Sequence, residues 1–265
     1  MHRRQNPILK SLICLLLSAG LIPGCAWMYP VAPKPVQPAG FITQDTVWQG
    51  LIEITQDILV PAGVTLTIKP GTLIRFTKNK QGQIDPRFLF TGHELLVRGN
   101  IRAGGTPERP IIFTSAQSDP QAGDWAGIIL DHVSGEGSWF TYCQIQYAET
   151  GIYCIRSSPR ITCNDFENTD YGIICQREAC PEIAGNLLLH GETGIACWDT
   201  SAPLIMDNYI AYQRQAGIMQ SREAMPWAER NIVEYNRYGL FGGQYYSWNA
   251  NQIRQNEQDF YPDTR

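Results

Sequence analysis

The chain has 265 residues, of which 43% are hydrophobic and only 17% are charged, and its net charge is −4. This composition excludes a disordered chain, and the acidic balance leaves no reason to expect a nucleic-acid partner. Glycine (24 residues) and proline (17 residues) are abundant. We therefore expect a turn-rich β protein, not a helical bundle or a coiled coil.

The first 24 residues have the features of an export signal. Arg3, Arg4 and Lys10 precede a mostly apolar run over residues 11–22, which is too short to span a bilayer but is typical of a signal peptide. The run ends in Leu-Ile-Pro-Gly-Cys at residues 21–25, and this segment resembles the bacterial lipobox. The resemblance implies lipid attachment at Cys25. The alternative is an ordinary secretory signal followed by an incidental cysteine.

A proline-rich segment follows the lipobox. Residues 30–38 contain four prolines, which favour an extended chain, so residues 25–44 are predicted to form a tether. The residue after Cys25 is Ala26 and not aspartate, which by resemblance to Gram-negative lipoproteins implies export to the outer membrane. We expect a cell-envelope location, with the membrane as a partner through the N-terminal lipid.

Short runs of alternating apolar and polar residues fill the next part of the chain. They cover residues 60–76, 95–101, 110–115 and 123–129, and this alternation predicts strands with one buried face. Residues 77–93 interrupt the pattern and predict a lateral loop. Long loops often carry function, and the alternative is a tolerated insertion.

From residue 141 onward, one pattern recurs about every 22 residues. A glycine followed by an apolar residue recurs in steps of 21, 22, 23 and 22 residues, and an asparagine precedes each of the last four. The glycines are Gly151, Gly172, Gly194, Gly217 and Gly239, and the asparagines are Asn164, Asn186, Asn208 and Asn231. The period predicts a coil of short strands in which equivalent residues stack about 4.8 Å apart. The asparagines are expected at tight turns, because asparagine tolerates left-handed backbone and its side chain can bond to the backbone of its neighbours.

These segments resemble right-handed parallel β-helix repeat proteins of the pectin-lyase-like fold. The resemblance covers roughly residues 45–261. It implies an all-β, single-stranded parallel solenoid over residues 45–265, with roughly eight to nine coils and a C-terminal cap. It implies no single function, because this fold hosts lyases, hydrolases, adhesins and accessory proteins.

Three of the eight cysteines share one repeat position. Cys154, Cys175 and Cys197 each follow their glycine by three residues and have the parity of an inward position. They are predicted to stack as buried thiols, to form a disulfide between adjacent coils, or to bind a soft metal ion. No aligned histidine or CxxC pair supports the metal. The other cysteines of the repeats are expected near turns, where Cys143–Cys163 or Cys175–Cys180 pairs could form.

Glu149, Asp170 and Glu192 form a second column, two residues before the glycines. Carboxylates stacked about 5 Å apart raise one another's pKa. The column is therefore a solvated polar turn, a Ca²⁺ site, or the acids of a glycosidase or lyase. By resemblance, polysaccharide lyases of this fold use acidic residues for Ca²⁺ and a basic residue for proton abstraction, but their motifs do not match here. A largely basic row lies five residues after the glycines: Arg156, Arg177, Asp199 and Arg222.

Aromatic residues concentrate in the last 40 residues. Flat rings with polar edges suit sugar binding, and the candidates for glycan contact are Trp227, Tyr238, Tyr245, Tyr246 and Trp248. The alternative is that these rings belong to the cap that covers the open end of the solenoid.

We therefore expect a lipid-anchored envelope module that binds glycan or protein on a lateral face without catalysis. The alternatives are a polysaccharide lyase or glycoside hydrolase that uses the acidic column, and a purely structural envelope protein. A binding module requires an exposed aromatic row beside a groove, whereas an enzyme requires the acids to line that groove. No cofactor or metal site is assigned, and Ca²⁺ is the one candidate ion.

Overall fold

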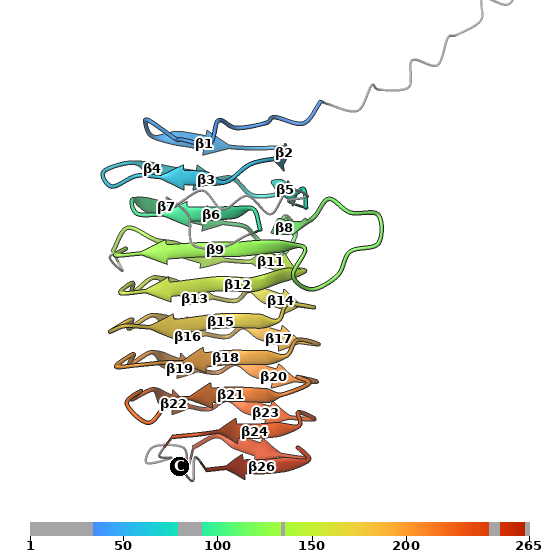
Figure 1. Ribbon diagram of the computed structural model, residues 1–265, viewed down its shortest axis with the longest axis vertical. Coiled ribbons are helices and arrows are strands. Elements are labelled where there is room, and N and C mark those ends of the chain that lie inside the picture. Colours follow the sequence, from blue (N-terminus) through green and yellow to red (C-terminus); the bar gives the residue numbers. More distant parts are fainter. Residues whose placement is uncertain (1–33, 79–91, 134–135, 244–249, 263–265) are drawn as a thin grey trace, which may run out of the picture. The chain divides into compact units, whose positions relative to one another are not determined.

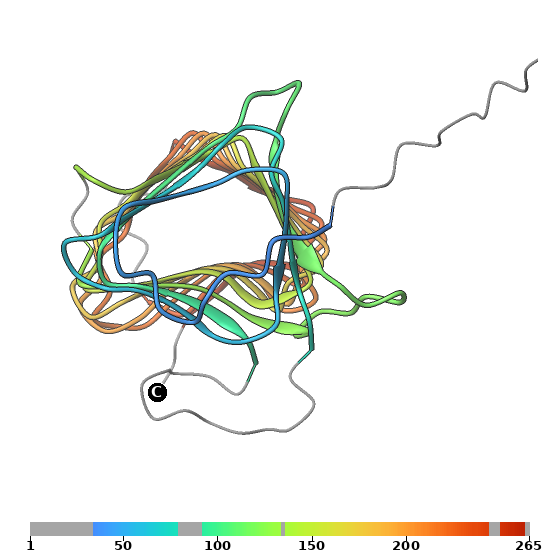
Figure 2. The same cartoon turned by 90° about the horizontal axis from the view of Figure 1, so that it is seen from above.

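A computed structural model describes residues 34–78, 92–133, 136–243 and 250–262. Its regular elements in these ranges are all short strands, and each turn of the chain visits three sheets in the same order (Figures 1 and 2). In the described ranges, no helix is long and apolar enough to cross a membrane. Strands that neighbour each other in a sheet are parallel. The expected all-β parallel β-helix is thereby confirmed.

In the described part of the chain, sheet 1 has eight strands and sheets 2 and 3 have nine each. Sheet 1 consists of β1 (Thr46–Trp48), β4 (Thr65–Ile68), β7 (Asn100–Gly104), β10 (Trp139–Thr141), β13 (Arg160–Thr162), β16 (Glu182–Ala184), β19 (Leu204–Met206) and β22 (Trp227–Glu229). Sheet 2 consists of β2 (Leu51–Ile54), β5 (Leu73–Phe76), β8 (Ile111–Ser115), β11 (Cys143–Gln146), β14 (Asp165–Glu167), β17 (Leu187–Leu189), β20 (Tyr209–Ala211), β23 (Ile232–Glu234) and β25 (Gln252–Arg254). Sheet 3 consists of β3 (Ile58–Val60), β6 (Glu94–Val97), β9 (Trp125–Asp131), β12 (Ala148–Ile155), β15 (Tyr171–Gln176), β18 (Thr193–Cys197), β21 (Ala216–Gln220), β24 (Tyr238–Phe241) and β26 (Gln258–Tyr261).

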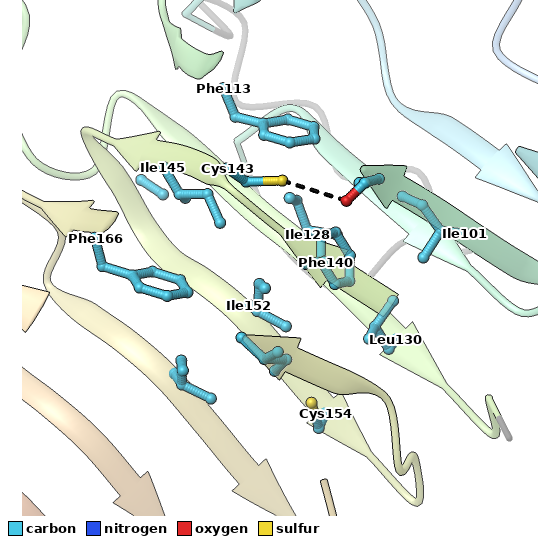
Figure 3. Packing of buried hydrophobic residues seen from close by; sticks show 14 of the residues in the cluster. Ile101, Phe113, Ile128, Leu130, Phe140, Cys143, Ile145, Ile152, Cys154 and Phe166 are labelled. Carbon is cyan, nitrogen blue, oxygen red and sulfur yellow. Dashed lines mark hydrogen bonds between the residues drawn. The ribbon is translucent and has the colours of Figure 1, made fainter. Parts of the chain in front are cut away.

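The core is built from inward columns of stacked apolar side chains. On sheet 3, one such column contains Ile152, Ile173, Ile195 and Ile218, all at most 1% exposed. Figure 3 shows Phe140 of sheet 1, Phe166 of sheet 2 and Ile152 of sheet 3 pointing into the same interior. The alternation in the sequence arises because successive side chains of a strand point to opposite faces.

The recurring asparagines form a buried ladder inside the turn between sheets 1 and 2. The side-chain amide of each donates to the side-chain carbonyl of the asparagine one coil later, at 2.8–3.0 Å. The members are Asn164, Asn186, Asn208, Asn231 and Asn251. The predicted turn position of the asparagines and their bonds to neighbouring backbone are confirmed, but the asparagine itself does not adopt the left-handed conformation. That conformation belongs to the residue before it, such as Cys163 (φ 55°) or Asp207 (φ 54°), and so the amide is free to turn inward.

Part of the predicted tether lies on the first coil. The backbone of Val36 pairs with that of Ile52, the backbone of Phe41 pairs with that of Leu59, and Ile42 is buried in the core. Of residues 25–44, the part from residue 36 therefore contacts the solenoid and caps its first strands. Cys25 lies outside the described residues, as does most of the predicted loop 77–93.

Candidate functional site

The three in-register cysteines occupy the interior of sheet 3. Cys154 pairs with Cys175 and Cys175 with Cys197 on β12, β15 and β18, and all three are fully buried. They are free thiols in the structure. Burial raises the pKa of Cys175 well above its ordinary value, and the neighbouring Cys197 adds to that rise. This arrangement agrees with the first of the three explanations, a stack of unreactive thiols that pack as small hydrophobic groups.

The other described cysteines do not form the pairs that the sequence left open. Cys143 lies in the core on β11, where its thiol contacts the Ala103 carbonyl oxygen at 3.6 Å (Figure 3), and burial raises its pKa. Cys163 and Cys180 are exposed free thiols. Cys143 therefore points into the interior while Cys163 points to solvent, and the two sulfur atoms lie on opposite sides of the chain.

The acidic column is in register at the start of the sheet 3 strands. Thr150, Tyr171 and Thr193 are strand partners, so the residues directly before them, Glu149, Asp170 and Glu192, follow one another along the edge between sheets 2 and 3. Burial raises the pKa of Glu149, and the carboxylate of Asp170 raises it further. The predicted stacking of the three acids is thus present in the structure.

An arginine that the sequence analysis missed lies against this column. Arg214 Nε is 2.7 Å from Glu192 Oε1, and its Nη2 is 3.9 Å from Asp170 Oδ1. Asn208 and Gly217 are nine residues apart, whereas the equivalent pairs in the other repeats are eight apart. The extra residue in that turn brings in Arg214, and the 23-residue step was the available signal.

Arg214 takes the position of a bridging cation between two of the acids. For Asp170, burial raises the pKa, Arg214 lowers it, and Glu192 raises it again. The described residues contain no group of three His, Cys, Asp or Glu side chains placed to hold a metal ion. The arrangement gives the Ca²⁺ hypothesis no support beyond the sequence pattern.

The basic row lies at the far end of sheet 3 from the acids. Arg156 and Arg177 follow the last residues of β12 and β15, whereas Glu149 and Asp170 lie at the other ends of these strands. Seven residues of strand separate the rows by about 20 Å. This row therefore provides no base beside the acidic column.

A hollow of about 670 Å³, here called the aromatic hollow, opens on the outer face of sheet 3 at its C-terminal end. Its main lining side chains are Trp198, Arg222, Glu223, Tyr238, Phe241 and Tyr261. They come from the ends of β18 and β21 and from β24 and β26, the last four strands of sheet 3 (Figure 1). None of the three column acids lines it.

The rings of the aromatic hollow are held by one another. Phe241 and Tyr261 are strand partners whose rings stack at 5.1 Å with planes 5° apart. The Tyr238 ring is tilted against both, at 5.3 and 4.9 Å between centroids. Such contacts fix ring orientation, so the hollow has a preformed aromatic wall beside two charged side chains.

The residues predicted to contact glycan do not all lie at one site. Tyr238 lines the aromatic hollow, but Trp227 lies on β22 of sheet 1, where it is 55% exposed. Tyr245, Tyr246 and Trp248 lie outside the described residues. Trp227 and Tyr238 were predicted to lie together because they are close in sequence, but they are half a coil apart and belong to different sheets.

A second hollow, of about 410 Å³ and here called the edge hollow, lies at the turn between sheets 2 and 3. Its lining includes Tyr212, Arg214, Tyr235, Arg237, Gln255 and Glu257. His190, Tyr212 and Tyr235 stack along this turn at 5.2 and 5.3 Å between centroids. Each follows a ladder asparagine by four residues, so counting from the asparagines would have found this stack.

The comparisons with known proteins agree with the architecture. A family model described as a right handed beta helix region matches residues 126–259, and one described as a pectate-lyase like beta helix domain matches residues 40–141. No curated protein matches. Among solved structures, a mutant of the periplasmic alginate epimerase AlgG is similar, with 13% identity and a TM-score of 0.38. That match covers 72% of this chain and 54% of the epimerase chain, so this chain spans about half the length of that relative.

Proposed function

The chain belongs to the right-handed β-helix family, and on that premise we propose that it is a module that binds glycan on the outer face of sheet 3 without catalysis. The observation that carries the proposal is the aromatic hollow. Rings that offer an apolar surface with polar edges suit the alternating C–H and O–H groups of a sugar. Arg222 and Glu223, both exposed at the rim, supply hydrogen-bond donors and acceptors for hydroxyl groups.

The proposal includes an envelope location. The lipobox-like segment supports lipid attachment at Cys25 and, with Ala26, export to the outer membrane of a Gram-negative cell. A membrane partner through the lipid and a glycan partner on the solenoid would tie the envelope to a polysaccharide.

A lyase or glycosidase is the second candidate, because Glu149 and Asp170 are stacked acids with raised pKa values. Two observations weigh against it. The acids do not line the aromatic hollow, and Arg214 forms an ion pair with Glu192 and lies 3.9 Å from Asp170. A purely structural protein, the third candidate, has no need for a preformed aromatic hollow.

The test is affinity electrophoresis through gels containing cellulose derivatives, chitin derivatives, alginate or homogalacturonan. We expect retardation by at least one polymer. Tyr238→Ala should weaken binding by about tenfold or more, since central aromatic contacts dominate binding energy. Trp198→Ala tests a second aromatic side chain of the aromatic hollow, at the end of β18, and should also weaken binding.

Trp227→Ala is the matched control, because it removes an exposed aromatic side chain from another sheet. Equal binding by Tyr238→Ala and wild type would refute the site. The same polymers, assayed for unsaturated products and reducing ends with and without Ca²⁺, test the enzyme. Turnover that disappears in Asp170→Asn would replace binding with catalysis as the function.

A further inference from the structure

We infer that the ligand is an extended chain that crosses the solenoid, from the aromatic hollow over the edge between sheets 3 and 2 into the edge hollow. The inference rests on the proposed function and adds to it the length of the ligand and the direction in which it lies. It also assigns a ligand-contacting role to Tyr212 and Tyr235.

The two hollows share a wall. Tyr238 lines the aromatic hollow and the preceding residue, Arg237, lines the edge hollow. The Arg237 guanidinium lies over the Tyr238 ring, with its central carbon 5.2 Å from the ring centroid. A cation over an aromatic face is attracted to it, so this pair forms a continuous surface between the hollows.

The sheet 3 column that contains Tyr238 offers no exposed side chain along the solenoid axis until Tyr171. Tyr238 belongs to an outward column that continues through Ala216 and Thr193 to Tyr171. Ala216 and Thr193 have no exposed surface, so this column offers a ligand no contact between the two tyrosines. By contrast, Tyr212 and Tyr235 are 46% and 44% exposed beside the edge hollow.

The edge hollow offers the groups that a further sugar unit needs. Tyr212 and Tyr235 stack with planes 6° apart and present their edges, while Arg214 and Arg237 stand beside them as fixed hydrogen-bond donors. Arg214 is already held by Glu192 at 2.7 Å, so less conformational freedom is lost when it binds.

The experiment measures affinity by calorimetry for oligosaccharides of two, four and six units from cellulose, chitin, alginate and homogalacturonan. Wild type should bind the six-unit chain of at least one series about tenfold more tightly than its two-unit chain. The double variant Tyr212→Asn, Tyr235→Asn should lose that gain and keep the two-unit affinity. Asparagine is chosen because Asn168 holds the same left-handed turn position (φ 54°) two coils before Tyr212, so the variant should fold.

Two matched variants give the controls. Tyr142→Asn changes a 38% exposed tyrosine in the left-handed conformation (φ 49°) at another edge of the solenoid, and it should bind like wild type. Tyr171→Thr probes the axial route, because threonine occupies this column on the neighbouring coils, and it should leave six-unit affinity unchanged.

Affinity that does not grow with length, or a double variant with unaltered six-unit affinity, would overturn the inference while the proposed function stands. A loss confined to Tyr171→Thr would show an axial path instead. Wild type that binds no oligosaccharide of any length would refute the proposed function itself. Circular dichroism and thermal melting confirm that each variant is folded.

Discussion

Two kinds of side-chain column run along this solenoid, and they are stabilised in different ways. In the inward columns, like side chains stabilise one another, since each ladder asparagine donates a hydrogen bond to the next and each stacked cysteine packs on the next. The carboxylates of the acidic column at the edge of sheet 3 cannot stabilise one another, because like charges repel. Arg214, which a one-residue insertion brings to this edge, forms an ion pair with Glu192 of the column. A repeat in the sequence therefore shows which residues stack. Whether the stacked side chains need a partner from outside the repeat depends on their charge and hydrogen-bonding groups.

The largest test of this difference is Asn208→Ala in the buried ladder. The Asn208 side chain donates to Ile183 O and Asn231 Oδ1, and it accepts from the backbone and side chain of Asn186. Its removal leaves buried polar groups without partners, so we expect a loss of about 3–5 kcal/mol in unfolding free energy. Urea denaturation measures it.

Asn251→Ala is the control for that change. Asn251 ends the ladder and is only partly buried, so water can replace its amide and the loss should be about 1 kcal/mol. Equal losses at the two positions would contradict the view that burial makes the ladder strong.

A smaller effect is expected for Cys175→Ser in the thiol stack. A serine hydroxyl at this fully buried position finds apolar and sulfur neighbours, and an unpaired hydroxyl should cost about 2 kcal/mol. Cys175→Ala, which buries no polar group, should cost about 1 kcal/mol. Thiol labelling of the native protein should modify Cys163 and Cys180 and spare the stack, and a disulfide between stack members in purified protein would contradict the packing role.

The smallest effect belongs to the acidic column and has the opposite sign. Burial and Asp170 raise the pKa of Glu149 above 4.5 in the folded state, so wild type loses stability as pH rises through and above that value. Glu149→Gln should therefore be more stable than wild type at pH 7, by about 0.5 kcal/mol, and equal to it below pH 4. Thermal melts across this pH range measure the difference.

Glu192→Gln is the matched comparison, because the same chemical change removes a carboxylate that Arg214 holds. It should be neutral or destabilising at pH 7. Stabilisation of similar size by both substitutions would show that Arg214 does not offset the repulsion.

Much of the architecture was predictable, because a solenoid turns sequence period into spatial register. The alignment of Cys154 with Cys175, and of Glu149 with Asp170, follows directly from the spacing of the glycines. The buried position of the asparagines did not follow, since residue type alone cannot tell which of two turn residues takes the left-handed conformation. The aromatic hollow was only partly predictable. Trp198 and Tyr238 lie 40 residues apart in sequence, and only the coil brings them to one face.

The direction of the asparagine ladder has a consequence for how the solenoid can change in length. Each amide donates toward the following coil, so a coil within the ladder presents an acceptor to the coil before it and a donor to the coil after it. A slip of one residue would move the amide out of the turn and reverse every side chain of the adjoining strands. A complete inserted coil with its own asparagine could accept a hydrogen bond from the asparagine of the preceding coil and donate one to the asparagine of the following coil. In the coils that it joins, the ladder therefore favours gain or loss of whole coils at the turn between sheets 1 and 2, whereas a single residue such as the one that brings in Arg214 is accommodated at the turn between sheets 2 and 3.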